Sequence, residues 1–382
     1  MITLLMLLSL ADTRNITLQT GPAPLIRAPA LTIPPRGARA PGNAVLIDFV
    51  PAEIRCEGKV VIPRFSVRPV PITAYALPDR PARVTFEFRI DETGRPLSIG
   101  LPRNDGHPYL DISDLAPALA AWRFASGTAR DGCSISFMLE ATPVDAAPAA
   151  LAHRALALPH STQPAEAALR ERVRRDDGDC ARPGYPALRR RVYPDFDRIP
   201  EAPGSSSYAM VGFDIDASGR PRNVRIRSSD GNAALDRAAI RAVGDTRFAP
   251  GARKGCSYPY HRRQNQPMPA PLLPPKASFR PANASCPLAS PRIEKVSRND
   301  FPAPFARRSI EGIAVIGYDV APWGAIGNIR VLAAEPAAAF GEEAKRVVAR
   351  GTASASEAGT GLVGCVTRIA FQLAGDGGDT PD

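Results

Sequence analysis

Histidine and aromatic residues are scarce in this chain of 382 residues, and their scarcity argues against several kinds of site. The sequence contains four scattered histidines, and aromatic residues make up 6% of it. No C-x-x-C pair occurs, whereas zinc sites draw on clustered Cys and His ligands. The sequence also lacks a G-x-S-x-G nucleophile motif and a phosphate-binding glycine loop after a strand. We therefore predict no catalytic residue, no metal and no cofactor.

Signals of nucleic-acid binding are also missing, although the chain is basic. Lys and Arg number 48 and Asp and Glu number 38, so the net charge is 48 − 38 = +10. Helix-turn-helix, RNP-like and zinc-finger spacings are absent, and few aromatic residues accompany the basic ones. We predict no nucleic-acid partner. The charge indicates a soluble basic surface or, alternatively, attraction to an anionic surface or partner.

Long apolar runs are missing apart from a short one at the start. Residues 1–11 read MITLLMLLSLA, which is shorter than the roughly 20 residues that span a bilayer. Ser9 and Ala11 are small residues of the kind that a signal-peptidase site requires. We expect a signal peptide or a truncated anchor at 1–11 and export to the periplasm. Membrane association is expected only if an anchor is present.

Proline, in contrast, is abundant. It accounts for 41 of the 382 residues, about twice the share of about 5% that is usual. The prolines cluster between segments that have strand patterns, and such stretches act as extended spacers. We expect an extended lead at 12–50, linkers at 143–178 and 264–285, and a disordered tail at 375–382.

The clearest structural pattern lies in Ala209–Phe248. Val211, Phe213 and Ile215 alternate with other residues as in a half-buried strand. The segment 217–220 reads ASGR and favours a turn, and a second alternating stretch follows it. Apolar residues then recur at helical spacing from Leu235 onward. This stretch therefore predicts strand, turn, strand and helix.

The six cysteines keep register with such a stretch three times. Taken in order as Cys56 and Cys133, Cys180 and Cys256, and Cys286 and Cys365, they are separated by 77, 76 and 79 residues. Each pair brackets one hairpin glycine, Gly94, Gly219 or Gly324, which follows the first cysteine by 38, 39 or 38 residues. Fixed spacing is the signature of repeated units. We predict one disulfide within each unit and hence an oxidising compartment, with six buried free thiols as the alternative.

The units are expected at 51–142, 179–263 and 286–374. The first has a strand at 84–90, a second strand at 97–101, and a helix in 112–122 that Pro117 either kinks or moves to a start near Leu115. The third has strands at 313–320 and 328–332 and a helix at 338–349. The last strands are expected at Ser134–Leu139, Ser257–His261 and Val366–Leu373. Pro259 places the second of these at a sheet edge.

Core positions of the second and third units follow a family pattern of an aromatic-Pro step, a hairpin and a helix. The matching residues are Tyr185-Pro186, Val211, Phe213, Ile215, Gly219, Val224 and Phe248-Ala249-Pro250 in the second unit, and Phe301-Pro302, Tyr318, Val320, Gly324, Ile329 and Phe340 in the third. These units resemble the C-terminal domain of TonB-type energy transducers. The first unit fits less closely, through Phe88, Ile90, Gly94 and Phe124.

The resemblance implies an α+β fold of three tandem small two-layer domains, each a three-stranded antiparallel sheet with helices packed on one face. It also implies a non-enzymatic protein that captures an extended peptide by pairing it with the edge of a last strand. The expected partner is a segment of a TonB-dependent outer-membrane transporter. The peptide-binding residues are then Val366, Thr367, Arg368, Ile369, Ala370 and Phe371 on the strand, with Phe301, Pro302, Tyr185 and Pro186 at the aromatic-Pro steps.

Three departures from the family leave other functions open. The usual transducer has a full-length membrane anchor, one such domain and no disulfide in it. A structural or scaffold protein is the alternative, with blocked sheet edges and a basic surface that faces envelope polymers or lipid. An enzyme of unrecognised type is the third reading. A free edge on the last strands favours peptide capture, whereas edges covered by the chain itself favour the scaffold.

Overall fold

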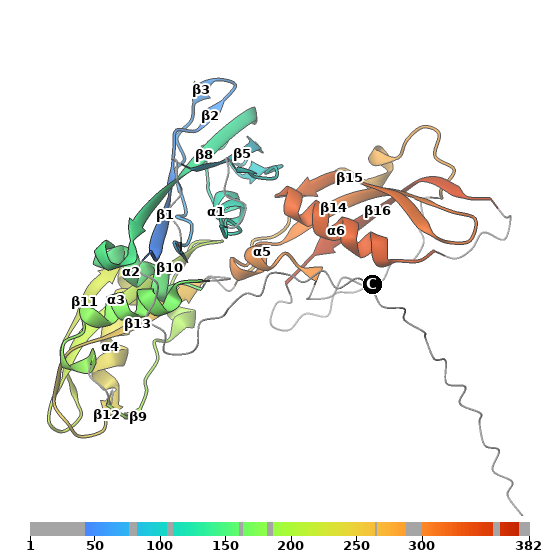
Figure 1. Cartoon of the computed structure of the whole chain (residues 1–382). Helices are drawn as coiled ribbons and strands as arrows, with labels where there is room; N and C mark the ends of the chain where they lie inside the picture. The colour runs from blue at the N-terminus through green and yellow to red at the C-terminus, as the bar shows by residue number, and fades with distance from the viewer. Residues whose placement is uncertain are drawn as a thin grey trace, which may run out of the picture. The chain divides into compact units, whose positions relative to one another are not determined.

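The computed structural model describes residues 43–75, 82–104, 110–159, 163–181, 186–263, 266–287, 300–353 and 360–373 (Figure 1). All of them belong to one unit, Ala40–Asp382. The expected signal segment, most of the expected lead, Tyr185 and the expected tail lie outside the described residues. Within the described ranges, no helix combines the length and the apolar character that crossing a bilayer requires.

The second sheet along the chain contains the hairpin that Ala209–Phe248 predicts. Its elements are β10 (Ser206–Ile215), β11 (Pro221–Ser229), α4 (Ala233–Asp245) and β13 (Arg253–Arg263). The strand order is β11-β10-β13, with both pairs antiparallel. Asn232 caps α4, because its side-chain oxygen accepts the N–H of Leu235 at 3.1 Å. The predicted succession of strand, turn, strand and helix is confirmed.

Helix α4 covers one face of this sheet (Figure 1). Leu235, Ala239 and Val243 recur at helical spacing and are at most 3% exposed. They pack with Val211 and Phe213, which alternate along β10 on the same face. A short two-stranded sheet of β9 (Leu188–Arg190) and β12 (Arg247–Phe248) follows the helix end. The short 3-10 turns Asp179–Ala181 and Phe196–Arg198 precede β10.

The third sheet has the same strand order and the same direction of pairing. Its elements are α5 (Ala303–Arg307), β14 (Gly312–Val320), β15 (Ile326–Glu335), α6 (Ala338–Arg350) and β16 (Leu362–Phe371). The order is β15-β14-β16. Both the second and the third sheet are therefore three-stranded and antiparallel, as expected, and each has a helix against one face.

The first sheet is larger than the expected three strands, with eight strands among the described residues. They are β1 (Val45–Pro51), β2 (Arg55–Cys56), β3 (Lys59–Val60), β4 (Ile72–Ala74), β5 (Arg83–Ile90), β6 (Pro96–Leu97), β7 (Arg103–Asn104) and β8 (Arg130–Pro143). Part of the expected lead is thus a strand. The reason is that Leu46, Ile47 and Phe49 are at most 2% exposed, so β1 carries core residues.

Two other elements of the first unit clarify the predictions. Helix α1 (Leu115–Ala120) begins at Leu115, so Pro117 lies in the first turn, where a missing N–H costs no intrahelical bond. The expected strand at 97–101 is reduced to β6. Ser98 has a φ of 49°, and Ile99 pairs instead with Ala337, next to α6.

The expected linkers also contain packed structure. Residues 143–178 hold a 3-10 turn (Val144–Ala146), α2 (Ala149–Ala157) and α3 (Glu166–Arg175). Arg154 on α2 is 4% exposed and donates to the carbonyl oxygens of Pro69 at 2.7 Å and Arg68 at 3.1 Å. In 264–285, a 3-10 turn covers Lys276–Phe279, and Met268 is buried and pairs with Ile310. These Ala- and Pro-rich stretches therefore pack against the sheets.

The hairpin glycines make one hydrogen bond that recurs in the three sheets. Gly94, Gly219 and Gly324 have φ values of 83°, 84° and 92°, and their carbonyl oxygens accept the N–H of Phe124, Phe248 and Ala353 at 2.9, 2.9 and 3.1 Å. A residue with a side chain rarely adopts such φ values. At Gly219 an added Cβ would also lie 2.2 Å from the carbonyl oxygen of Phe248. The turn therefore requires glycine for two separate reasons.

We predict that Gly219→Ala destabilises the chain more than Gly231→Ala. Gly231 has a similar φ of 85°, but an added Cβ there meets nothing within 4 Å. The control substitution should cost about 1–2 kcal/mol for the left-handed backbone alone. The clash should add about 2 kcal/mol at Gly219. Urea unfolding followed by circular dichroism measures both, and equal losses would contradict the close approach.

Candidate functional site

Three disulfides hold the start of the last strand in the three sheets. They join Cys56 to Cys133, Cys180 to Cys256 and Cys286 to Cys365, which is the pairing that the spacing predicts. The second cysteine of each pair lies near the start of β8, β13 or β16. The segment around the first cysteine is thereby laid against the last strand. In the third sheet, for example, the N–H of Cys286 donates to the carbonyl oxygen of Val363 at 3.1 Å.

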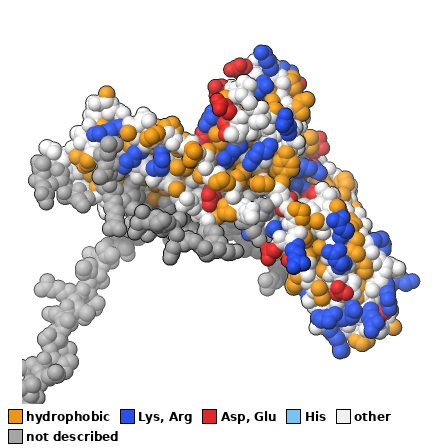
Figure 2. Space-filling view, turned by 180° about the vertical axis from the view of Figure 1, so that it is seen from behind, with side chains coloured by type: hydrophobic (Ala, Val, Ile, Leu, Met, Phe, Trp, Pro, Cys, Tyr) orange, Lys and Arg blue, Asp and Glu red, His pale blue; other side chains and the backbone are white. Residues whose placement is uncertain are grey.

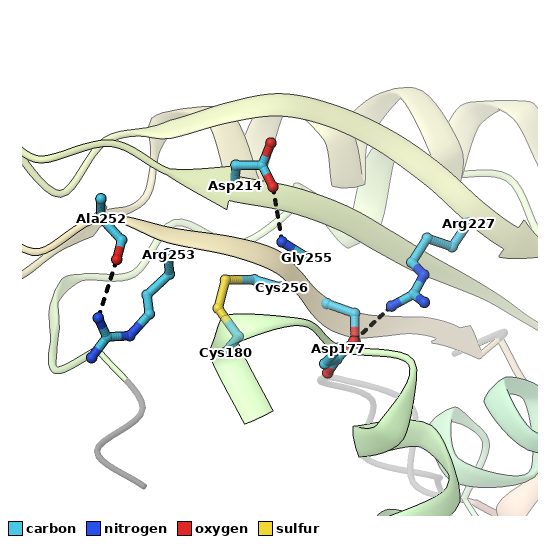
Figure 3. The surroundings of a disulfide bond; sticks show 9 residues. Asp177, Cys180, Asp214, Arg227, Ala252, Arg253, Gly255 and Cys256 are labelled. Carbon is cyan, nitrogen blue, oxygen red and sulfur yellow. Dashed lines mark hydrogen bonds and ion pairs between the residues drawn. A yellow bond between two sulfur atoms is a disulfide. The ribbon is translucent and has the colours of Figure 1, made fainter. Parts of the chain in front are cut away.

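A carboxylate reinforces this anchor in the second sheet (Figure 3). Asp214 on β10 accepts the N–H of Gly255 at 2.8 Å, and its other oxygen accepts the side-chain amide of Asn223 at 2.7 Å. The hydrogen bond from Asn223, followed by that from Gly255, lowers the pKa of Asp214. Gly255 and Asn223 have φ values of 73° and 52°, which suit glycine and asparagine. The hairpin and the last strand are thus tied directly.

The third sheet repeats the arrangement. Asp319 accepts the N–H of Gly364 and the side-chain amide of Asn328, both at 2.8 Å. The pKa of Asp319 is lowered by these two bonds, with that of Gly364 the larger cause. In the first sheet Arg89 takes the place of the carboxylate and donates to Ser98 at 3.0 Å.

Asp177 adds a second carboxylate beside the disulfide of the second sheet (Figure 3). It accepts the guanidinium of Arg227 at 2.6 Å and the hydroxyl of Ser257 at 2.9 Å. Burial raises the pKa of Asp177, and the two hydrogen bonds oppose that effect. The residues before Cys180 are therefore fixed to both β11 and the first part of β13.

The last strand of the first sheet, expected at Ser134–Leu139 and a candidate edge for peptide capture, has no free edge, so that expectation is wrong. β8 pairs with β5 on one side. On the other side it pairs with β2 at Ser134 and with β1 from Phe137 onward, and the N–H of Ala52 donates to the carbonyl oxygen of Ser136 at 2.8 Å. The sequence reasoning missed this because β1 lies in the segment expected to be a lead.

The last strand of the third sheet is covered at its start. The N–H of Ser285 donates to the carbonyl oxygen of Val363 at 3.0 Å, and the N–H of Val363 donates back to the hydroxyl of Ser285 at 2.9 Å. Along the predicted binding residues Val366–Phe371, β14 is the strand partner among the described residues. Arg368 of this stretch donates from its side chain to the carbonyl oxygens of Leu273 and Pro274.

The last strand of the second sheet is open beyond its start, which Asp177 and Cys180 hold. Within the described part of the chain, β13 has a strand partner only in β10. A hollow of about 520 Å³ follows this strand. It is lined by Pro159, Tyr193, Phe196 and residues 258–263. Pro259 lies in the middle of the strand, as predicted for an edge.

A separate pocket of about 340 Å³ lies beside β13, at the end of helix α4. It is lined by Pro186, Leu188, Arg191, Phe213, Val243, Thr246, Phe248, Ser257, Tyr258 and Tyr260. Pro186 is the described half of a predicted aromatic-Pro step, whereas Tyr185 lies outside the described residues. The sequence reasoning missed this pocket, although the alternation of Tyr258 and Tyr260 was a signal of two aromatic rings on one face of a strand.

The second aromatic-Pro step lies in the third sheet. Phe301 packs edge-on against Phe340 and Phe371, with ring centroids 6.0 Å apart in both pairs. Pro302 is buried and caps α5. The structure therefore brings Phe301 to the end of the predicted binding strand, while Pro186 belongs to the second sheet.

Groups suited to catalysis are not gathered in the described residues. No set of three or more His, Cys, Asp or Glu side chains is placed to hold a metal ion there. His153 is buried and lies 2.7 Å from the hydroxyl of Ser228. Burial, with a smaller effect of Arg227, lowers the pKa of His153 to about 4. This histidine is neutral at pH 7 and packs between α2 and β11.

We predict that Asp214→Asn weakens the fold at pH 7 and weakens it less at pH 2. The pKa of Asp214 is lowered in the folded state, so its contribution is present above the unfolded pKa of about 3.9 and is lost as pH falls through the folded pKa. Because Asp214 is half-exposed, the loss at pH 7 should be about 1 kcal/mol. Urea midpoints at the two pH values measure it. The exposed Asp197→Asn is the control, and a loss as large at pH 2 as at pH 7 would contradict the anchor.

A comparison with known protein families finds one match, and it lies in the second sheet. Residues 193–265 match the family described as Gram-negative bacterial TonB protein C-terminal. That range contains β10, β11, α4 and β13, and it leaves out the first and third sheets. No curated protein matches the chain. The family is one of non-enzymatic, envelope-associated energy-transducer domains, and a single copy of its pattern is what the match covers.

Proposed function

We propose that the chain is a TonB-like periplasmic protein that captures an extended peptide by strand addition to β13. The observation that carries this proposal is that β13 pairs on one side only, with β10, among the described strands, inside the range that matches the TonB family. An edge strand offers a row of N–H and C=O groups to another chain. Backbone hydrogen bonds then give affinity, and side-chain pockets give specificity.

The first sheet indicates which groups of β13 face outward. Phe88 pairs with Cys133 and Phe213 pairs with Cys256, so Ser136 and Pro259 hold corresponding positions, three residues further on. The carbonyl oxygen of Ser136 accepts a hydrogen bond from the N–H of Ala52, just after β1, on the side away from β5. The outward side of Pro259 therefore corresponds to the side of Ser136 that bonds Ala52.

Outward groups recur at every second residue of a strand. Ser257 and His261 are thus expected to direct their N–H and C=O groups toward a captured peptide. Pro259 supplies its carbonyl oxygen but no N–H, which weakens unspecific pairing at this edge. The same reasoning supports Val366–Phe371 as a second edge, since β14 is its strand partner in the described residues.

The proposed organisation is three related units, at 51–142, 179–263 and 286–374. The recurring hairpin glycine, the recurring disulfide and the shared strand order of the second and third sheets support it. The proposed partner is a segment of a TonB-dependent outer-membrane transporter. Three disulfides suit the oxidising periplasm, and we infer export through the segment 1–11. Tandem edges would raise avidity by effective concentration.

One observation favours a scaffold role for part of the chain. Both sides of β8 are occupied by strands of the chain itself, so the first sheet offers no edge there. Figure 2 shows Lys and Arg side chains spread among hydrophobic ones over the face in view. A basic surface of this kind attracts anionic polymers or lipid. In this second candidate function the first sheet holds the chain to the envelope.

We predict that Pro259→Ser strengthens peptide binding and His261→Pro weakens it. The first change adds an outward N–H, as at Ser136 in β8, and the second removes one without affecting the bonds to β10. One hydrogen bond changes affinity by about threefold to tenfold. The measurement is NMR titration of the full chain with N-terminal peptides of outer-membrane transporters, followed at the amides of residues 257–263.

The matched control is Ser136→Pro in β8, where the strand edge is already occupied. It should leave peptide affinity unchanged even if it lowers stability. Amides of Ser257 and His261 should shift more than those of Tyr258 and Tyr260, which face β10. If neither 257–263 nor 366–371 shifts at millimolar peptide, capture by strand addition does not occur.

A further inference from the structure

The pocket beside β13 differs from the corresponding place in the first sheet. Its floor is Phe213, which stacks on Phe248 with ring centroids 5.7 Å apart. The first sheet has the same pair of rings, since Phe88 lies 6.2 Å from Phe124. The two stacked rings are thus common to both sheets. The sheets differ in the residue that packs above these rings.

Strand pairing fixes the correspondence of the other positions. In the first sheet Phe65 pairs with Arg123, and in the second Arg190 pairs with Arg247. The residues just before Arg123 and Arg247 are Trp122 and Thr246. Val67 lies two residues after Phe65, and Val192 lies two residues after Arg190. Trp122 therefore corresponds to Thr246, and Val67 to Val192.

In the first sheet the indole of Trp122 fills this place. It is 2% exposed, and its N–H donates to the carbonyl oxygen of Val67 at 2.9 Å. The ring packs edge-on against Phe137, with centroids 6.2 Å apart. Phe137 corresponds to Tyr260, because Phe137 follows Cys133 by the four residues that separate Tyr260 from Cys256.

In the second sheet Thr246 is too small to fill the same place. The pocket of about 340 Å³ opens between Thr246, Tyr258 and Tyr260. The carbonyl oxygen of Val192, which corresponds to the acceptor of the indole N–H, takes only a long bond of 3.5 Å from the hydroxyl of Tyr260. The second sheet therefore keeps the floor and the wall of an indole site, with the carbonyl oxygen of Val192 next to the Tyr260 hydroxyl, but lacks the indole.

The mouth of the pocket carries a cation. The guanidinium of Arg191 lies 5.1 Å from the ring centroid of Tyr258 and 5.7 Å from that of Tyr193. A cation in this position attracts the face of a further aromatic ring, indole most strongly. The pocket volume is near the lower end for ligand sites, which fits one ring system rather than a large cofactor.

We propose that this pocket binds the indole side chain of a tryptophan from the captured peptide, with the ring on Tyr260 and its N–H on the carbonyl oxygen of Val192. This inference deepens and rests on the proposed peptide capture at β13. Tyr258 and Tyr260 belong to the strand whose edge receives the peptide. A tryptophan in the partner would therefore be selected at the same place where its backbone pairs.

The test uses N-acetyltryptophanamide as the probe and the full chain with labelled methyl groups. Titration should shift the methyl signals of Val243 and Thr246 in the wild-type chain. Thr246→Trp copies the first sheet and should lower the affinity at least about tenfold, because its own indole occupies the pocket. Thr246→Ser keeps both the hydroxyl and the opening, and should bind within about twofold of the wild type.

A ligand series keeps the test valid if Thr246→Trp fails to fold. The 1-methylindole analogue cannot donate to Val192 and should bind about threefold to tenfold more weakly, and N-acetylleucinamide should not bind. Absent shifts at Val243 in the wild type, or undiminished binding by folded Thr246→Trp, would overturn the proposal. Binding that appears only in Tyr185→Ala would also overturn it, since the chain would then fill its own pocket.

A tryptophan-free transporter peptide separates this inference from the proposed function. If that peptide shifts the amides of Ser257 and His261 while N-acetyltryptophanamide does not bind, peptide capture stands and the indole site is wrong. If the probe binds the pocket but no peptide shifts the edge, strand addition fails, and with it the inference that the indole comes from a captured peptide.

Discussion

The fixed start of the last strand is the constraint on which the candidate site depends. In the second and third sheets a glycine with positive φ donates to an aspartate of the neighbouring strand, and a disulfide-bonded cysteine follows. The anchor positions the first residues of the strand and lays an earlier segment beside them. Whether the rest of the outer edge is covered then depends on whether another segment of the chain pairs with it. β1 covers β8, whereas no described strand covers the outer side of β13.

An open edge of this kind needs protection from unspecific pairing, and β13 has it in its sequence. Pro259 removes one outward donor in the middle of the strand. His261 is exposed, and Arg263 at the end of β13 adds exposed charge, which opposes stacking of a second copy. The first sheet shows the other solution, in which a strand from the same chain takes the edge. The last strand is thus closed by the chain in the first sheet, whereas in the second sheet it is the proposed site of capture.

Local patterns in the sequence predict much of this fold, and long-range pairing is what they miss. Alternation in 209–215 and the helical spacing from Leu235 predict the second sheet, and the cysteine spacing predicts all three disulfides. β1 is missed because its partner, β8, lies more than 80 residues later and its surroundings are rich in proline. Helix α2 in the expected linker 143–178 is missed because alanine signals both linker and helix. The pocket beside β13 cannot be predicted from sequence patterns, because the correspondence of Trp122 and Thr246 follows only from the strand register.

The proposed edge and the pocket belong to the same strand, β13. Successive residues of β13 alternate between the face that meets α4 and the opposite face, while the backbone groups point sideways to the edge. A peptide that pairs with Ser257 and His261 therefore passes beside Tyr258 and Tyr260 without further movement of the chain. Backbone pairing alone is tolerant of sequence, so the proposed indole site next to it would provide the discrimination that the edge lacks. In the proposed function, the presence of Thr246 in the second sheet where the first sheet has Trp122 is what would make the second sheet selective.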